Sequence, residues 1–275
     1  MQRIRCAVLM VTALGLGLGC ASSQSGAPAS SNVHWREASR PVGISGWAQE
    51  LPASFQQVVA VGCSPLAHPD RSLELAIDRA YENLARAQQV RVEARSAELF
   101  EGRFRFPVQH TSEALNEGAE DRARSGAVVL DTLVIEGPPG ARTVRTYVLV
   151  GPPGISLPSE NRTFRPFDVS GPPEWFNIPP EAPGYLFGVG ACGFYPEVAD
   201  AWGAVEKLAR LDLAGEVFTQ SHSGITDELK GKGARTYGYS EQNVRADLRS
   251  VVIMARHYDP EGRMFYALAR MPVRR

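Results

Sequence analysis

Four cysteines carry the most reactive side chains of this 275-residue chain. Cys6 and Cys20 lie in the N-terminal region, whereas Cys63 and Cys192 each follow a short apolar run that contains glycine. The last two could form the one intramolecular disulfide of the mature fold, and an oxidising compartment would permit it. Two interpretations stay open, a Cys63–Cys192 bridge and two separate buried thiols, and we favour the second.

A glycine pattern typical of nucleotide binding precedes a predicted helix. Gly188-Val-Gly190-Ala-Cys-Gly193 fits G-x-G-x-x-G, the loop that cradles a pyrophosphate at a helix N-terminus. A dinucleotide site also needs an acidic residue about 20 positions later, at the end of a second parallel strand. Asp212 lies inside the helical pattern instead, so we predict structural turns at Gly62, Gly188, Gly190 and Gly193, and no cofactor.

Other chemistry-bearing residues do not form a catalytic or metal-binding pattern. None of the five histidines has ligand spacing to another histidine or cysteine. Ser221-His222-Ser223 lacks a nucleophile elbow. We therefore predict no metal, no catalytic residue and no enzyme. Arginines of the last hairpin, including Arg256 and Arg270, are expected on a solvated strand face.

The first 20 residues have the pattern of an export signal. Met1–Arg5 is basic, and residues 6–18 are apolar and small, a run shorter than the about 18 residues that span a bilayer. Gly17-Leu-Gly-Cys20 then resembles the end of a bacterial lipoprotein signal, in which the cysteine sulfur carries a diacylglycerol. A plain cleaved secretory signal is the alternative. Because Ala21 is not the aspartate that retains many lipoproteins at the inner membrane, the resemblance implies an outer-membrane anchor.

Composition excludes a nucleic-acid partner and divides the chain. Without Arg3 and Arg5 of the leader, 27 basic and 30 acidic side chains remain from the 29 and 30 of the whole chain. Nucleic-acid binders need a basic stripe, which this balance does not provide. Residues 21–42 are rich in Ser, Ala, Gly and Pro, which predicts a flexible tether. A second Pro- and Gly-rich stretch, residues 152–172, predicts a linker between two modules, 43–151 and 173–275.

Each module has the same predicted order of elements. In the first, a strand at Val58–Val61 precedes a helix whose apolar residues recur at three- and four-residue spacing from Leu73 to Ala87. Two strands at 127–135 and 143–150, joined by a Pro-Gly turn, follow it. The second module repeats this order with a strand at 185–189, a helix from about 196 to 218 and strands at 242–257 and 264–271.

Matched residues indicate that the modules are tandem copies. Trp47 and Trp175 both stand fourteen residues before a valine that ends the first strand, and residues 80–86 are identical to 204–210 at five of seven positions. Tyr147 matches Tyr266. These matches predict an α+β fold of two modules, each a small, mainly antiparallel sheet packed on one long helix. The two tryptophans are expected in the core of their own modules, with exposed carbohydrate platforms as the alternative.

The second module resembles a known family. Pro173-Glu-Trp175, Pro179-Pro180, Tyr185–Gly190 and the alanine-rich helix that follows resemble the LPP-twenty lipoprotein domain, to which the N-terminal part of the FlgT-type flagellar H-ring protein is related. The first module departs from the pattern, since Ala60 replaces the first glycine and no Pro-Pro follows Trp47. The resemblance implies a surface or periplasmic lipoprotein with no established catalysis.

Leader, repeat and resemblance together predict a non-enzymatic protein of the cell envelope. We expect it to be held at the outer membrane by lipid on Cys20 and to act as a scaffold or accessory of a surface or periplasmic assembly, with an envelope protein as its partner. A flagellar-type assembly is one such setting. The alternative is binding of peptidoglycan or another envelope glycan through the glycine loops or the tryptophans.

Overall fold

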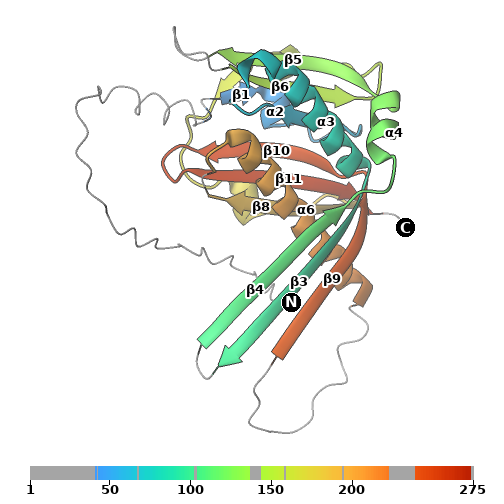
Figure 1. Cartoon of the computed structure of the whole chain (residues 1–275), viewed down its shortest axis with the longest axis vertical. Coiled ribbons are helices and arrows are strands. Elements are labelled where there is room, and N and C mark those ends of the chain that lie inside the picture. The colour runs from blue at the N-terminus through green and yellow to red at the C-terminus, as the bar shows by residue number, and fades with distance from the viewer. Residues whose placement is uncertain are drawn as a thin grey trace, which may run out of the picture.

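The computed structural model describes residues 41, 43–66, 68–101, 104–136, 144–157, 159–193, 195–222 and 239–273. Helices and short antiparallel sheets alternate in it, which confirms the predicted α+β class (Figure 1). Each module contributes one three-stranded antiparallel sheet with a long helix on one face.

In the first module, the helix α3 (Ser72–Gln88) covers a sheet of three strands in the order β2-β6-β5. These strands are β2 (Ala60–Cys63), β5 (Val128–Glu136) and β6 (Val144–Gly151). Most of the predicted apolar stripe of α3 is buried against this sheet, with Ala76, Ala80 and Leu84 completely inaccessible to solvent. Leu73, the first residue of the stripe, is instead 49% exposed. The stripe forms because alanines and leucines recur on one side of a 3.6-residue helical period.

The second module repeats this arrangement with α6 (Val198–His222) and a sheet in the order β8-β11-β10. Its strands are β8 (Tyr185–Cys192), β10 (Val252–Asp259) and β11 (Met264–Pro272). In both sheets the strand before the helix pairs with the last strand of the module. The helix α6 packs on β8 and β11 and also reaches β2 of the first module.

Strand registers show that the two sheets are equivalent residue by residue. Tyr147 lies opposite Cys63, and Tyr266 lies opposite Ala191, as the predicted match of the tyrosines requires. Both hairpins also carry an irregularity at the same place: β5 shifts register between Val129 and Asp131, and β10 does so between Ile253 and Ala255, 124 positions later in each case. A shared bulge is a feature that copies of one module keep.

The glycines predicted as turns lie inside strands, so that prediction is wrong for Gly62, Gly188 and Gly190. A Cβ atom on Gly190 would lie 2.2 Å from the carbonyl oxygen of Val205 in α6. Glycine is therefore needed at these positions because strand and helix backbones touch, not because the chain reverses. Gly193 does follow the end of β8 directly.

The same contacts correct the alignment of the two helices. Gly62 faces the backbone of Ala76 and Ala80, whereas Gly190 faces that of Val205 and Ala209. The equivalent helix positions are therefore 129 residues apart, not the 124 that the identical residues 80–86 and 204–210 suggest. Alanines recur along both helices, so a helix displaced by five residues still aligns similar residue types.

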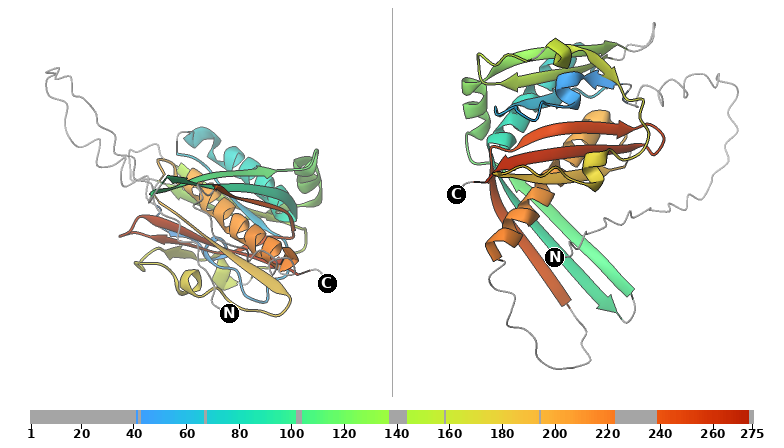
Figure 2. Two further views of the ribbon diagram at one scale, coloured as in Figure 1. Left: turned by 90° about the horizontal axis from the view of Figure 1, so that it is seen from below. Right: turned by 180° about the vertical axis from the view of Figure 1, so that it is seen from behind.

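A third sheet joins the modules. It has the order β4-β3-β9 and consists of β3 (Gln89–Glu101), β4 (Phe104–Ala114) and β9 (Tyr239–Arg249). It extends away from the rest of the molecule (Figures 1 and 2). Strand β3 was not predicted. The single strand predicted at 242–257 is two strands, because Ser250 adopts a left-handed conformation (φ 57°) between β9 and β10.

The remaining elements are short. They are β1 (Gly43–Ser45), α2 (Gly46–Gln49), η1 (Pro69–Arg71), α4 (Ala119–Gly126), η2 (Ser159–Arg162), β7 (Phe164–Pro166) and α5 (Glu174–Asn177). Strand β7 lies in the stretch predicted as a linker and pairs with β1. The linker stretch therefore contributes regular structure to the body.

Trp47 lies in a core that both modules share. It is 1% exposed, and its helix α2 packs on β10 of the second module, where the backbone N–H of Leu51 donates to the carbonyl of Met254 (2.8 Å). Trp47 is buried in a core as predicted, but that core contains residues of both modules, because the segment after Trp47 crosses to the sheet of the second module. Trp175 is half-buried against the same core.

Candidate functional site

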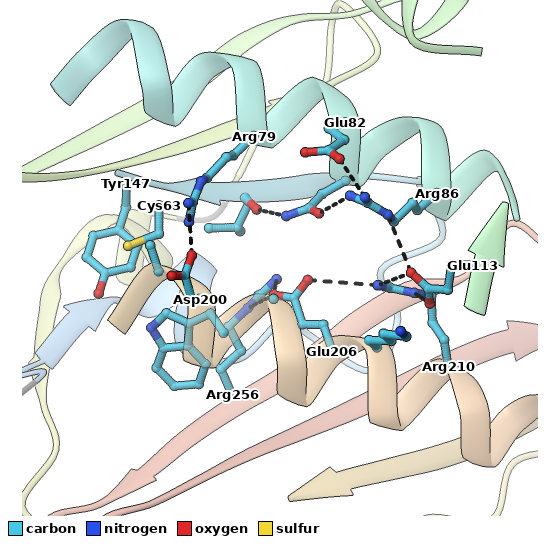
Figure 3. Close-up of a pocket in the computed structure, with 16 residues that line it drawn as sticks. Cys63, Arg79, Glu82, Arg86, Glu113, Tyr147, Asp200, Glu206, Arg210 and Arg256 are labelled. Atoms are coloured by element: carbon cyan, nitrogen blue, oxygen red, sulfur yellow. Dashed lines mark hydrogen bonds and ion pairs between the residues drawn. The ribbon is translucent and has the colours of Figure 1, made fainter. Parts of the chain in front are cut away.

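A cleft of about 310 Å³ opens where the two modules meet, between α3 and α6 (Figure 3). Five basic and four acidic side chains line it together with aromatic residues and Cys63. None of this was predicted as a site. Clefts at the boundary between two units of a fold are common places for ligand binding.

Buried ion pairs occupy one end of the cleft. Glu113, at the end of β4, accepts two hydrogen bonds from the guanidinium of Arg210 in α6, at 2.7 and 3.1 Å. The same carboxylate lies 3.4 Å from Arg86 of α3. The side chains of Arg210 and Glu113 are only 5% and 8% exposed. Their pairing therefore links α3, α6 and the projecting sheet in a low-dielectric setting.

A second buried pair lies deeper, between Glu206 of α6 and Arg256 of β10, at 2.8 Å. Arg256 also donates to the carbonyl of Ala48 in α2 (3.1 Å), so this side chain of β10 binds both α6 and α2. Arg256 and Arg270 are each 5% exposed, and the expectation of a solvated strand face is wrong for both. Their charges are buried because carboxylate and backbone oxygens surround them.

An exposed pair spans the opposite end of the cleft. Arg79 of α3 and Asp200 of α6 meet at 2.9 Å, with side chains 34% and 53% exposed. The pair stands beside Cys63 and Tyr147 in Figure 3. Because both side chains are partly hydrated, separating them costs much less than separating the buried pairs.

Three buried side chains close the cleft beyond Arg79, namely Cys63, Tyr147 and Trp202. The hydroxyl of Tyr147 is a neighbour of the indole N–H of Trp202 and of the Cys63 thiol, but these contacts do not reach hydrogen-bond geometry. Neither the hydroxyl nor the indole N–H has another partner among the described residues. Burial raises the pKa of the Cys63 thiol to about 11 and the pKa of Tyr147 above its usual range. Both groups therefore carry their protons at neutral pH.

Cys63 and Cys192 are free cysteines, so the structure contains two separate thiols and no bridge between them. Each thiol donates to a nearby carbonyl, that of Ser64 (3.6 Å) and that of Ala201 (3.5 Å) respectively. Burial raises the pKa of Cys192 to about 12. Thiols with such pKa values are mostly protonated near pH 7 and react slowly.

Asp212, which a dinucleotide site would need on a strand, lies inside α6 as the sequence indicated. It accepts a hydrogen bond from the backbone N–H of Val189 on the edge strand β8 (2.9 Å). Asn83 occupies the equivalent place in α3 and donates to the carbonyl of Val61 (2.8 Å). Both residues fasten a helix to a strand edge. Burial raises the pKa of Asp212.

Several predicted features lie at or beyond the limits of the described residues. Cys20, the predicted lipidation site, falls outside them, as do residues 1–40 in general. Within them, no helix has the length and apolar character to cross a bilayer. The same part of the chain contains no group of three or more His, Cys, Asp or Glu side chains that could hold a metal ion.

The paired residues of the cleft escaped prediction because each looks ordinary in sequence. Glu82 and Arg86 stand at i, i+4 spacing, which is typical of a solvated helix surface. Glu206 and Arg210 have the same spacing in α6, but the two pairs are not equivalent in the structural register of the helices, in which matching positions are 129 residues apart. No local pattern therefore indicated a shared site.

Comparison with known proteins adds no relative. No protein-family model, no curated protein sequence and no solved structure matches the chain. The resemblance of the second module to the LPP-twenty domain therefore stays a prediction.

Proposed function

We propose that the protein is a lipid-anchored component of the cell envelope, which acts as a non-enzymatic scaffold or accessory of a surface or periplasmic assembly. The observation that carries the proposal is the leader, a basic start and a short apolar run that end at Cys20. A diacylglycerol and an N-acyl chain on this cysteine would anchor the protein firmly, because each buried methylene contributes about 0.8 kcal/mol.

The organisation of the body supports a scaffolding role. The two modules share a core, a sheet and buried ion pairs, so they form one rigid unit rather than two mobile domains. The carboxylates of Glu113 and Glu206 are each bound by arginine, which suits a structural network better than proton transfer. The projecting sheet β4-β3-β9 offers an envelope protein a contact surface away from this unit (Figure 1).

Substitution of the lipidated cysteine tests the anchor. In a bacterial host that processes lipoproteins, Cys20→Ser should move the protein from the detergent-extracted membrane fraction to the soluble fraction. Cys6→Ser, in the apolar run of the same leader, is the matched control and should leave the protein in the membrane. Membrane retention of Cys20→Ser would reject the anchor. Crosslinking of the wild-type protein in cells should then capture a defined envelope protein that Cys20→Ser fails to reach.

The glycan alternative loses most of the residues on which it depended. Gly62, Gly188 and Gly190 are covered by helices, and Trp47 is buried. Of the residues it invoked, Trp175 and Gly193 remain partly exposed. Sedimentation with purified sacculi distinguishes this alternative from a scaffold: enrichment that Trp175→Ala abolishes would favour glycan binding.

A further inference from the structure

We propose that the end of the cleft bounded by Arg79, Tyr147 and Trp202 binds a small organic monocarboxylate that carries a second hydrogen-bond acceptor, such as a 2-hydroxy acid. Arg79 receives the carboxylate, and the hydroxyl of Tyr147 and the indole N–H of Trp202 receive the second acceptor. This site goes beyond the scaffolding role and does not depend on it.

The first argument is the pair of buried polar groups without a partner. Tyr147 is 1% exposed and Trp202 is 4% exposed, and both line the cleft. Their polar atoms bond to nothing among the described residues. A buried donor without an acceptor destabilises a fold, so such groups are rare unless a ligand or water completes them. An indole N–H can only donate, which requires an acceptor on the ligand.

The second argument is that the arginines of the cleft differ in how fully they are bound by carboxylates and carbonyls. Arg210 and Arg256 are saturated by buried carboxylates and a backbone carbonyl. Arg79 instead makes one hydrogen bond to the half-exposed Asp200. Five basic against four acidic side chains leave the lining with one excess positive charge. A monoanion neutralises this excess. Lys207 is held by the carbonyl of Thr111 (3.0 Å) and Arg86 is bound by Glu82 and Glu113. Arg79 is therefore the arginine of the lining that can exchange its carboxylate partner at the lowest cost.

Size and access agree with a small ligand. The cleft volume of about 310 Å³ lies at the lower limit of small-molecule pockets, roughly 300 to 1,000 Å³. The polar atoms of Tyr147 and Trp202 are sealed from solvent in this state. The ligand carboxylate therefore replaces Asp200 as the partner of Arg79, and separation of that exposed pair opens the way to the two aromatic side chains.

The test follows the four indole N–H resonances of the full chain, labelled on tryptophan and held in detergent micelles. The probes are sodium lactate, acetate and phosphate, each compared with sodium chloride at equal ionic strength. Trp202→Phe assigns the resonance of Trp202. Lactate should move that resonance downfield in a saturable manner and raise the melting temperature. Acetate, which lacks the second acceptor, should bind more weakly.

Matched variants separate the site from general effects. Arg79→Gln should weaken lactate binding at least about tenfold, since a charge-assisted hydrogen bond is lost, and Tyr147→Phe should weaken it several-fold. Arg71→Gln and Tyr266→Phe change an exposed arginine and the equivalent tyrosine of the second module, and should change nothing.

Three results would overturn the site. They are the absence of a lactate-specific shift of Trp202, a shift that Arg79→Gln leaves intact, and a response to phosphate alone. None of them affects the membrane test of Cys20→Ser, so the site and the anchor fail independently.

Discussion

Alanine at Gly190 should destabilise the protein strongly, although the same change elsewhere in the module stabilises it. The added Cβ would lie 2.2 Å from the carbonyl oxygen of Val205 and 2.7 Å from the amide nitrogen of Ala209. Both atoms belong to the backbone of α6 and cannot rotate away. The whole helix must therefore retreat from β8 by about 1 Å to restore an ordinary contact.

The magnitude follows from how much packing that retreat disturbs. Insertion of a group into a packed core costs roughly 1–3 kcal/mol when side chains can adjust. Here α6 packs on β8, β11 and β9 and carries Glu206, whose bond to Arg256 measures 2.8 Å, so we expect about 3 kcal/mol or more. Gly203 lies in the same helix, and a Cβ atom added to it would have no other atom within 4 Å. Gly203→Ala should stabilise by about 0.5–1 kcal/mol through helix propensity.

Urea unfolding followed by far-ultraviolet circular dichroism measures both changes. The two alanine variants should differ by about 4 kcal/mol in free energy of unfolding, with opposite signs relative to wild type. Gly62→Ala should behave like Gly190→Ala, because its Cβ would lie 2.0 Å from the carbonyl of Ala76. A Gly190→Ala protein within about 1 kcal/mol of wild type would refute the claim that strand and helix backbones touch.

Three further predictions concern the paired and titratable groups. Glu113→Gln should cost about 3 kcal/mol in urea unfolding, because it leaves the buried charge of Arg210 with only Glu206, at 4.0 Å, as a carboxylate partner. Glu74→Gln on the exposed face of α3 should leave the urea midpoint unchanged, and equal effects of the two changes would contradict the buried pair. Asp212→Asn should raise the free energy of unfolding at pH 7, because burial raises the pKa of the folded carboxyl. As the pH falls through that raised pKa, the wild-type protein should gain stability relative to the variant. A stability difference that stays constant between pH 7 and pH 3 would refute this. Cys63 and Cys192 should react with maleimide at pH 7 only after denaturation, and treatment with a reductant should leave the mass of the protein unchanged. Rapid labelling of Cys63 in the native protein would contradict its pKa of about 11.

Local patterns in the sequence were sufficient for the long helix of each module and for most strands of the sheet that it covers, but not for β3. The helical stripe of α3 and the hairpin of β5 and β6 could be predicted because residues close in sequence make their contacts with one another or with one adjacent face. The match of Tyr147 with Tyr266 likewise indicated that the last strands of the two modules are equivalent. Helix register could not be found from identities, because alanine-rich helices look alike when displaced by a turn or more.

The candidate site depended on contacts between distant parts of the chain. Glu113 and Arg210 are 97 residues apart, and Arg256 and Ala48 are 208 apart. A charged residue on a helix or strand reads as solvated unless its partner is known, and no local rule supplies a partner at that distance. The cleft was therefore invisible from the sequence.

The sequence by itself determined a leader-like N-terminus and two copies of an α+β module, because both follow from periodicity and residue type along a short stretch. Only the tertiary structure decided how the copies join. It placed α6 against its own sheet and against β9, joined the two modules in one core that includes Trp47, and buried arginines expected in water. The physical reason is that burial of a charge or an aromatic ring is a property of its surroundings, and those surroundings are assembled from residues far away along the chain.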